Sequence, residues 1–478
     1  MSVDIKEFLE IEKKYDLYHL EVEGVQCWQY IRFRFWNYKI CSMQLGLSSS
    51  SAKQGKASAF LNVLGSLSYI LLHPDKRKLR QADICFVAHE RRTKSNGQYE
   101  CLYTDRLKES WYPDAITLEK PFRMQHLRPA RTKNLYYTDL INIKGSIQCQ
   151  IQIVGKTSHY RKVYREVHRL FGSPLDEIIQ KYHLELEKEE IERQLAKTVL
   201  ECQVLKKCYG KCLDIVKPKV IIEVVGYAKL NMILNELAKE KGIITIELQH
   251  GTMHGDHAAY QYAKGCGVIS QFPDVLFLFS DYWKHCIHVP IKDDAIKVVG
   301  YPYFEQKLQQ YPKTAADEKE RILFISQGTI GIELSKLAAE TAALLDGDKY
   351  RIIYKLHPEE YARWRERCPW LCNENIEVID SLEHNIYEYF SICNIQVGVY
   401  STAVYEGLGF GLRTFIYRIG HADTMKELCS QGYGSFVSDA SELVRKITDR
   451  QEKGKKCPEL FWKREALKNM KNEIEQYI

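Results

Sequence analysis

Short apolar runs alternate with longer amphipathic segments through much of the second half of the chain. The runs PKVIIEVVG, IITIELQHG, DVLFLFS and AIKVVGYP lie between Pro218 and Pro302, and segments such as AKLNMILNELAKEKG separate them. Runs that are apolar at every position predict strands buried on both faces, and the segments between them have the periodicity of helices. The pattern predicts a parallel sheet that helices cover on both sides.

A second series of the same kind follows the polar segment QQYPKTAADEKE, which we interpret as a linker. Its expected strands are RILFISQG, YRIIYKLHP, IEVID, NIQVGVYS and LRTFIYR. Its expected helices include IELSKLAAETAALL, HNIYEYFSIC, AVYEGLGFG and one that runs from Pro358 through Trp364. The predicted fold class is therefore α/β, with two Rossmann-like, doubly wound domains whose strand ends face a shared cleft.

The first part of the chain is less regular. Residues 1–80 predict a helical N-terminal extension that contains the serine-rich loop GLSSSSAKQGKAS. ADICFVAHERR and DAITLEK are expected as strands, so we assign residues 81–305 to a first Rossmann-like domain and residues 306–458 to a second. Residues 459–478 predict a C-terminal helix that could cross back to the first domain.

Composition narrows the class of protein. The chain has 68 basic and 62 acidic residues, a net charge of +6 that is mild for 478 residues and does not indicate a nucleic-acid partner. Its 15 cysteines include no CxxC pair, which is typical of reduced thiols in a cytoplasmic protein. The first residues, MSVDIKEFLEIEKK, contain no apolar core of a signal peptide.

One segment bears on localisation. SAFLNVLGSLSYILLHPDKRKLR joins an apolar stretch, Ala59 to Leu72, to the basic residues Lys76, Arg77 and Lys78. The stretch is shorter than the roughly 20 apolar residues of a spanning helix. Two interpretations stay open: a buried helix with a solvated basic end, or a surface helix that rests on an anionic membrane. The second would place the protein peripherally on the inner face of the cell membrane.

The motif LQHGT follows an expected strand and places a histidine at the carboxyl edge of the first sheet. An imidazole there can accept a proton near neutral pH, which suits a general base, and the following glycine lets a ligand approach the backbone. The segment also has the spacing H-x3-H-x2-H, but its glycines argue against the helix that such metal ligands need, so we expect no metal. The residues we assign to this edge are Gln249, His250, Gly251, Thr252 and His254.

The motif KLHPEE places a second histidine, His357, at the end of a strand, directly before Pro358. Proline fits the first turn of a helix, and the free amides of a helix start suit a pyrophosphate. Lys355 is included in this expected phosphate site.

Two further turns belong to the same expected edge. In GVYSTAVYEGLGFG, Ser401 and Thr402 are expected to cap a helix and to hold phosphate oxygens, while Glu406 could accept hydrogen bonds from a ribose. In SQGTIG, Gly328 opens a strand–helix turn that can admit a phosphate.

The order QHGT, G-x-P, K-L-H-P and S-T-x3-E-G resembles bacterial glycosyltransferases of the two-Rossmann GT-B type. The families it is similar to are the CDP-glycerol glycerophosphotransferases and the capsule, polysialic-acid and Kdo transferases, over Pro218 to Arg418. In the glycerophosphotransferases the first motif reads W-H-G-T-P, whereas this chain has Gln249 through Met253. The proline–arginine expected after the later glycine is replaced by Pro302–Tyr303, and these departures favour a glycosyl donor.

The resemblance implies roles for individual residues. His357 would bind the donor phosphates with help from Ser401 and Thr402, and His250 would be the catalytic base or an acceptor-side residue. In polysialic-acid and Kdo transferases the base is instead an acidic residue of the first domain, for which Glu90 and Glu223 are the candidates.

The function expected from the residues and the resemblance together is that of a glycosyltransferase. It would move a sugar from a nucleotide-activated donor, bound by residues 306–458, to a cell-surface polysaccharide or glycolipid acceptor, bound by residues 81–305. It would need no cofactor or metal and would invert the anomeric carbon. The alternatives are a glycerol- or ribitol-phosphate transferase with a CDP-alditol donor, a sugar-nucleotide 2-epimerase-like isomerase, and a non-catalytic subunit that binds a glycan or a partner enzyme.

Overall fold

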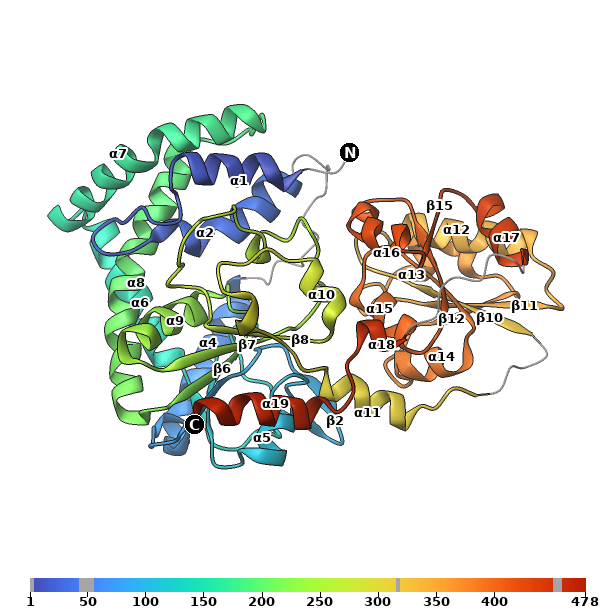
Figure 1. Ribbon diagram of the computed structural model, residues 1–478, viewed down its shortest axis with the longest axis horizontal. Helices are drawn as coiled ribbons and strands as arrows, with labels where there is room; N and C mark the ends of the chain where they lie inside the picture. Colours follow the sequence, from blue (N-terminus) through green and yellow to red (C-terminus); the bar gives the residue numbers. More distant parts are fainter. Residues whose placement is uncertain (1–3, 43–55, 315–318, 450–457) are drawn as a thin grey trace.

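The computed structural model describes residues 4–42, 56–314, 319–449 and 458–478, which form two α/β domains lying side by side (Figure 1). Residues 46–55 of the expected serine-rich loop and residues 315–318 of the expected linker fall outside the described residues, whereas residues 56–58 are helical. The 14 cysteines in the described part of the chain are all free thiols.

The N-terminal domain is built on a seven-stranded parallel sheet in the order β5-β4-β1-β6-β7-β8-β9. Every pairing in it is parallel. The strands are β1 (Ile84–Val87), β4 (Ile116–Glu119), β5 (Leu135–Tyr137), β6 (Val220–Val224), β7 (Ile244–Leu248), β8 (Val275–Leu278) and β9 (Ile296–Val298). The first strand is central and the chain winds outward from it in both directions, which is the Rossmann order.

The C-terminal domain repeats this topology with six parallel strands in the order β12-β11-β10-β13-β14-β15. The strands are β10 (Glu320–Ile325), β11 (Tyr350–Lys355), β12 (Ile376–Ile379), β13 (Ile395–Gly398), β14 (Arg413–Tyr417) and β15 (Ser435–Val437). The predicted fold class, two doubly wound α/β domains, is therefore confirmed. The strand order reverses between β1 and β6 in one sheet and between β10 and β13 in the other, where such folds bind ligands.

Helices around the N-terminal sheet include the first segment of the chain. They are α1 (Ile5–Lys14), α2 (Cys27–Phe35), α4 (Lys56–Leu72), α5 (Asp105–Trp111), α6 (Asp139–Val154), α7 (Ser158–Lys181), α8 (Lys188–Val216) and α9 (Lys229–Lys241). Side chains of α1 and α2 share a buried apolar cluster with α7, α8 and α9. A hairpin of β2 (Thr93–Ser95) and β3 (Gln98–Glu100) lies outside the main sheet. None of the described helices is long and apolar enough to cross a membrane.

The chain passes between the domains twice. After α10 (Asp281–His285), which connects β8 to β9, it leaves the N-terminal domain through α11 (Pro302–Gln310), and it returns through α18 (Pro458–Phe461) and α19 (Ala466–Ile474). Met470 and Ile474 of α19 are buried with residues of β1 and β6 (Figure 1). In the C-terminal domain the helices are α12 (Gly331–Leu344), α13 (Trp364–Arg367), α14 (Ile386–Ile392), α15 (Thr402–Gly409), α16 (Lys426–Ser430) and α17 (Ala440–Thr448).

Candidate functional site

The carboxyl edges of the two sheets meet at the junction between the domains. Gly251 follows β7 of the N-terminal domain, and Thr402 follows β13 of the C-terminal domain. A Cβ atom on Gly251 would lie 3.7 Å from Oγ1 of Thr402. The QHG turn and the serine–threonine turn are therefore close enough to contact one small ligand.

His250 lies half-buried in the QHG turn and is held by two tyrosines. The hydroxyl of Tyr227 lies 3.2 Å from Nε2 of His250, and the hydroxyl of Tyr103 donates to the His250 carbonyl at 2.8 Å. Nδ1 of His250 is buried and has no hydrogen-bond partner among the described residues. An unpaired nitrogen of this kind costs free energy unless something bonds to it, so it marks a position for a ligand atom.

The histidines at the junction are uncharged at neutral pH. Burial lowers the pKa of His250 to about 3, with His89 adding to the shift and Glu90 opposing it. Burial also lowers the pKa of His254 to about 4, and the nearby His421 of the C-terminal domain adds to this shift. A neutral imidazole can either accept a proton or donate a hydrogen bond from its N–H.

Gln249 shapes the turn but does not reach the junction. Its side chain is buried, with Nε2 donating to the carbonyl of Gly251 at 2.8 Å and Oε1 accepting from the amide of Phe279 at 2.8 Å. Both ends of the amide are therefore bonded within the protein. Thr252 is half-buried directly after the turn.

On the C-terminal side, the turn after β10 connects the two expected phosphate motifs. Oγ1 of Thr329 and the hydroxyl of Tyr400 are 2.7 Å apart, and the amide of Tyr400 donates to the side chain of Gln327 at 3.3 Å. A Cβ atom on Gly328 would lie 3.6 Å from Nδ1 of His357. His357 therefore lies on the same edge as Ser401, with the turn at Gly328 between them.

The helix expected at Pro358 is not formed, and this corrects the expectation of free amides at that position. Residues 358–363 form turns, and only Trp364–Arg367 is helical. Oε2 of Glu360 accepts from the amide of His357 at 2.7 Å, and the Glu360 amide donates back to the His357 carbonyl at 2.8 Å. Because the Glu360 carboxylate takes this amide, the His357 imidazole, whose side chain is 42% exposed, is the group left for a ligand.

Lys355 does not point a free ammonium toward the junction. Its Nζ donates to the Tyr361 hydroxyl at 2.8 Å and to the Ser381 carbonyl at 2.9 Å, and its side chain is buried. These two oxygens hold the ammonium beside the β11–α13 turn, so we leave Lys355 out of the donor site.

Ser401 caps α15 as predicted, with its side chain accepting from the amide of Ala403 at 3.2 Å. Glu406 lies one turn further along and accepts from the Tyr387 hydroxyl at 2.8 Å. Burial raises the pKa of Glu406 to about 7, although the bond from Tyr387 opposes this shift. Glu406 can therefore change its charge near neutral pH.

The two acidic candidates for the base differ in position. Glu90 follows β1 and is 37% exposed, with Oε2 3.4 Å from Nζ of Lys120. Burial acts to raise its pKa, but the charge of Lys120, a hydrogen bond from the Glu90 amide and the charge of His89 together hold the pKa of Glu90 below its ordinary value. Glu223 lies within β6 and is fully buried, so the expectation that it serves as base is wrong: no acceptor hydroxyl can reach it.

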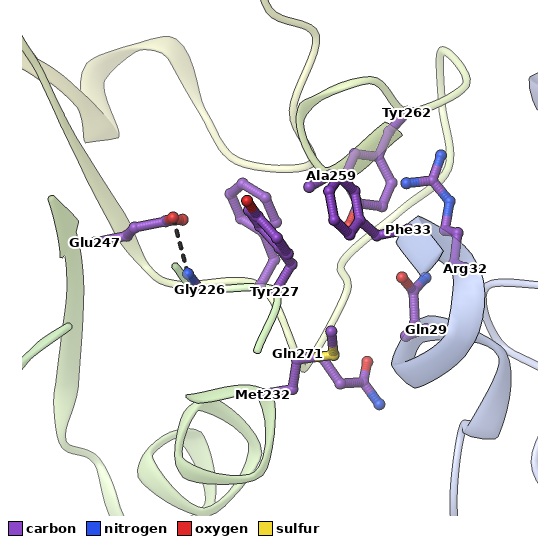
Figure 2. A pocket seen from close by; sticks show the side chains of 11 residues that line it. Gln29, Arg32, Phe33, Gly226, Tyr227, Met232, Glu247, Ala259, Tyr262 and Gln271 are labelled. Atoms are coloured by element: carbon purple, nitrogen blue, oxygen red, sulfur yellow. Dashed lines mark hydrogen bonds between the residues drawn. The ribbon is translucent and has the colours of Figure 1, made fainter. Parts of the chain in front are cut away.

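A buried acidic pair lies behind the site. Glu223 and Glu247 are register partners on β6 and β7. Oε1 of Glu247 accepts from the amide of Gly226 at 2.8 Å and from the hydroxyl of Tyr260 at 2.7 Å. Figure 2 shows the bond to Gly226 and a small cavity of about 20 Å³ that Glu247 and Tyr227 help to line.

Helix α2 holds the loop that follows the QHG turn. Arg32, which pairs with Glu12 of α1, donates from Nη2 to the carbonyl of Gln261 at 2.6 Å and from Nη1 to that of Ala258. Nε1 of Trp36 donates to the carbonyl of Asp256 at 3.0 Å. The residues of α2 that face the cavity appear in Figure 2, with the Arg32 side chain beside Tyr262. The first helices of the chain thus help to position the candidate site.

Several residues at the junction were not found from the sequence. They are His89, Tyr103, Tyr227, Tyr400 and His421. Four of them follow a strand within four residues, which is the same signal that drew attention to His250. Tyr103 lies in a loop before α5, and nothing in its sequence context indicates that it contacts His250.

A pocket of about 330 Å³ opens beside the turns at Gly328 and Glu360. Arg363, Arg367 and the largely buried Trp364 line it together with the carboxylates of Glu333, Glu359 and Glu360, so its wall carries charges of both signs. Its volume lies in the range of small-molecule sites. Among the residues with described positions, no three His, Cys, Asp or Glu side chains converge to hold a metal ion.

Comparison with known proteins gives a structural likeness only. No protein-family model matches the chain, and no curated protein matches it in sequence. A putative UDP-N-acetylglucosamine 2-epimerase from Listeria monocytogenes has 8% identity and a TM-score of 0.48, covering 82% of this chain and 97% of that one. S. aureus MnaA with UDP has 10% identity and a TM-score of 0.48, covering 83% and 97%.

The wall teichoic acid polymerase TagF is also similar, with 10% identity and a TM-score of 0.38 over 89% of this chain and 94% of that one. Likeness at this level assigns the chain to no family.

Proposed function

We propose that the protein is a glycosyltransferase that moves a sugar from a nucleotide-activated donor to a hydroxyl of a cell-surface polysaccharide or glycolipid. One observation carries the proposal: the turn at Gly251 faces the helix start at Thr402 across the domain junction, so closely that a Cβ atom on Gly251 would lie 3.7 Å from Oγ1 of Thr402. Two Rossmann-like sheets that meet at their carboxyl edges can bind two substrates and place their reacting atoms together.

In this proposal the donor binds to the C-terminal domain. The pocket beside Gly328 takes the nucleoside, since its volume of about 330 Å³ lies in the range of small-molecule sites. The phosphates lie near His357, the Ser401 hydroxyl and the start of α15, whose helix dipole favours negative charge. The His357 imidazole would donate one hydrogen bond to a phosphate oxygen.

The acceptor hydroxyl lies beside His250 on the N-terminal side. Its oxygen attacks the anomeric carbon, the bond from that carbon to the leaving phosphate breaks, and the hydroxyl proton passes to His250. The negative charge of Glu90 favours the imidazolium that forms, although the low pKa of about 3 means that bound phosphate must also raise the basicity of His250. A single displacement inverts the anomeric carbon.

The first experiment identifies the donor nucleotide. Unfolding temperature is measured with CMP, CDP, UDP, GDP and ADP, and a ligand at about 100 times its Kd stabilises by about 2.7 kcal/mol. Selective stabilisation by one nucleotide supports the donor site. Stabilisation by none of the five contradicts the proposal. Selectivity for CDP would direct the assay to CDP-alditol donors, and conversion of a UDP-sugar without an acceptor would indicate an isomerase.

The second experiment separates the two histidines. His357→Asn should abolish the nucleotide-dependent stabilisation, whereas His250→Asn should retain it and lose turnover by about 100-fold or more, as expected for a general base. His384→Asn is the matched control, because that imidazole is 61% exposed and pairs with Glu388 on α14. Normal turnover in both site variants would refute the assignment.

A further inference from the structure

Large apolar side chains are exposed together in one part of the N-terminal domain. Eight of the fifteen that are exposed in the described part of the chain lie on α4, on α6 and in the loop before β5. We call these eight residues the α4–α6 surface: Leu64, Leu71, Leu72, Met124, Leu140, Ile147, Ile151 and Val154. Monomeric proteins rarely expose apolar side chains in such concentration without a partner.

The spacing along each helix places these side chains on one face. On α6 the exposed positions are separated by seven, four and three residues, which is the period of a helical stripe. The opposite face of α6, with Ile141, Gly145 and Cys149, is buried and packs toward α8. The exposed stripe is therefore a second apolar face that no described residue covers.

Helix α4 and the loop before β5 lie side by side. The Ser66 hydroxyl donates to the Met124 carbonyl at 3.2 Å, and the guanidinium of Arg128 lies 3.7 Å from the ring centre of Tyr69. Helix α6 begins two residues after β5, against which Ile70 of α4 packs. Helix α6 lies on the side of the N-terminal domain away from the C-terminal domain (Figure 1).

The charge around this surface is mainly positive, although the exposed carboxylate of Asp75, which pairs with Nζ of Lys76 at 2.8 Å, lies just after α4. Between Lys120 and Lys156 the chain has a single acidic residue, Asp139, which is buried and bonded to Nε2 of His126 at 2.8 Å. The exposed basic residues around the apolar side chains are Arg77, Lys78, Arg123, Arg128, Lys133, Lys144 and Lys156. Two copies of so cationic a surface would repel each other, which argues against a dimer as its partner.

We propose that the α4–α6 surface binds an anionic phospholipid bilayer, with its apolar side chains at the acyl boundary and its cations against the lipid phosphates. The proposal needs neither nucleotide nor turnover, so its failure and the failure of the proposed function are distinguishable.

The test is co-sedimentation of the full chain with vesicles of equal parts phosphatidylglycerol and phosphatidylcholine, or of phosphatidylcholine alone. The chain should bind the anionic vesicles at low salt and dissociate at high salt. The double variant Leu72→Ser with Val154→Ser should bind about tenfold more weakly. Each of these two side chains is 78% exposed, and serine would bury much less apolar surface in the lipid. Val268→Ser with Leu382→Ser is the matched control, with side chains 76% and 77% exposed elsewhere, and should bind as the unaltered chain does.

A second pair tests the cations. Arg123→Gln with Arg128→Gln should weaken binding about fivefold for each charge removed, whereas Lys264→Gln with Lys292→Gln should have no effect. Equal binding to neutral vesicles, or equal loss in the control variants, overturns the proposal. A dimer in solution that the Leu72 and Val154 changes dissociate would also overturn it, since the surface would then be covered by a second copy. Unchanged melting temperatures show that each variant is folded.

Discussion

Replacing Glu247 with glutamine should remove one large contribution to the pH dependence of stability. Glu247 is 1% exposed, and burial raises its pKa from an ordinary value of 4.5 to about 7, with the bonds from Tyr260 and Gly226 opposing the shift. Between these two pH values the folded chain holds a proton that the unfolded chain has lost. Stability therefore falls as pH rises through this interval.

The expected size follows from the two pKa values. At about 1.4 kcal/mol for each pH unit, the folded chain loses about 3 kcal/mol of stability between pH 4.5 and pH 7 through this one group. Glutamine keeps an oxygen that accepts from Gly226 and Tyr260 and carries no charge against Glu223. The free energy of unfolding of the variant, relative to that of the unaltered chain, should therefore be about 3 kcal/mol higher at pH 8 than at pH 5.

The assay is urea unfolding followed by tryptophan fluorescence, at pH 5 and at pH 8, for both chains. Trp28 and Trp36 are buried in the N-terminal domain and report its transition. Glu240→Gln is the control, because this exposed glutamate lies on α9 between the same two strands. The difference between variant and unaltered chain should grow with pH for Glu247→Gln and stay constant for Glu240→Gln. A constant difference for both would show that Glu247 does not hold the proton.

Three further predictions concern the junction. Gly251→Val should reduce turnover about tenfold or more while stability changes little, because its branched side chain would meet Thr402 across the 3.7 Å approach, and Gly251→Ala should be tolerated. Tyr227→Phe removes the hydroxyl that neutral His250 contacts at 3.2 Å, so the acid limb of the kcat profile should move to higher pH, and an unmoved limb would exclude this contact from the mechanism. Turnover should stay within about twofold after EDTA treatment, since the proposed displacement uses no metal ion, and a loss restored by a divalent cation would refute that mechanism.

Most of the fold could be predicted because its strands are apolar at nearly every position. The runs at residues 220–224 and 352–356 are buried at every position. The strands that were missed are three residues long: β2, β3, β5 and β15. A segment so short has too few positions for a period to appear, and its pairing depends on neighbours that are distant in sequence.

The candidate site was predictable only in part. The position of His250 after a strand was enough to place it at the sheet edge. Whether an amide or a carboxylate at this edge is free to bind a ligand depends on local hydrogen bonds, which the sequence does not reveal. The backbone amide of His357, for example, already donates to the carboxylate of Glu360. Glu223 was expected to act as the base because a carboxylate inside an apolar run suggests a function. In the structure it lies beside Glu247 on the neighbouring strand and accepts a hydrogen bond from the side-chain amide of Asn235.

The double passage of the chain between the domains limits how the two halves can move. Gly300 has a φ of 97° and lies against the carbonyl of Lys463, so the outgoing and returning segments touch at the crossing. Because the two crossing segments are joined at neighbouring points, the domains can open by a small rotation about the line through these points. They cannot slide far past each other. Substrate entry would then occur as a swing that separates Gly251 from Thr402 while Trp462, packed between Phe279 and Phe304, stays in place as the pivot.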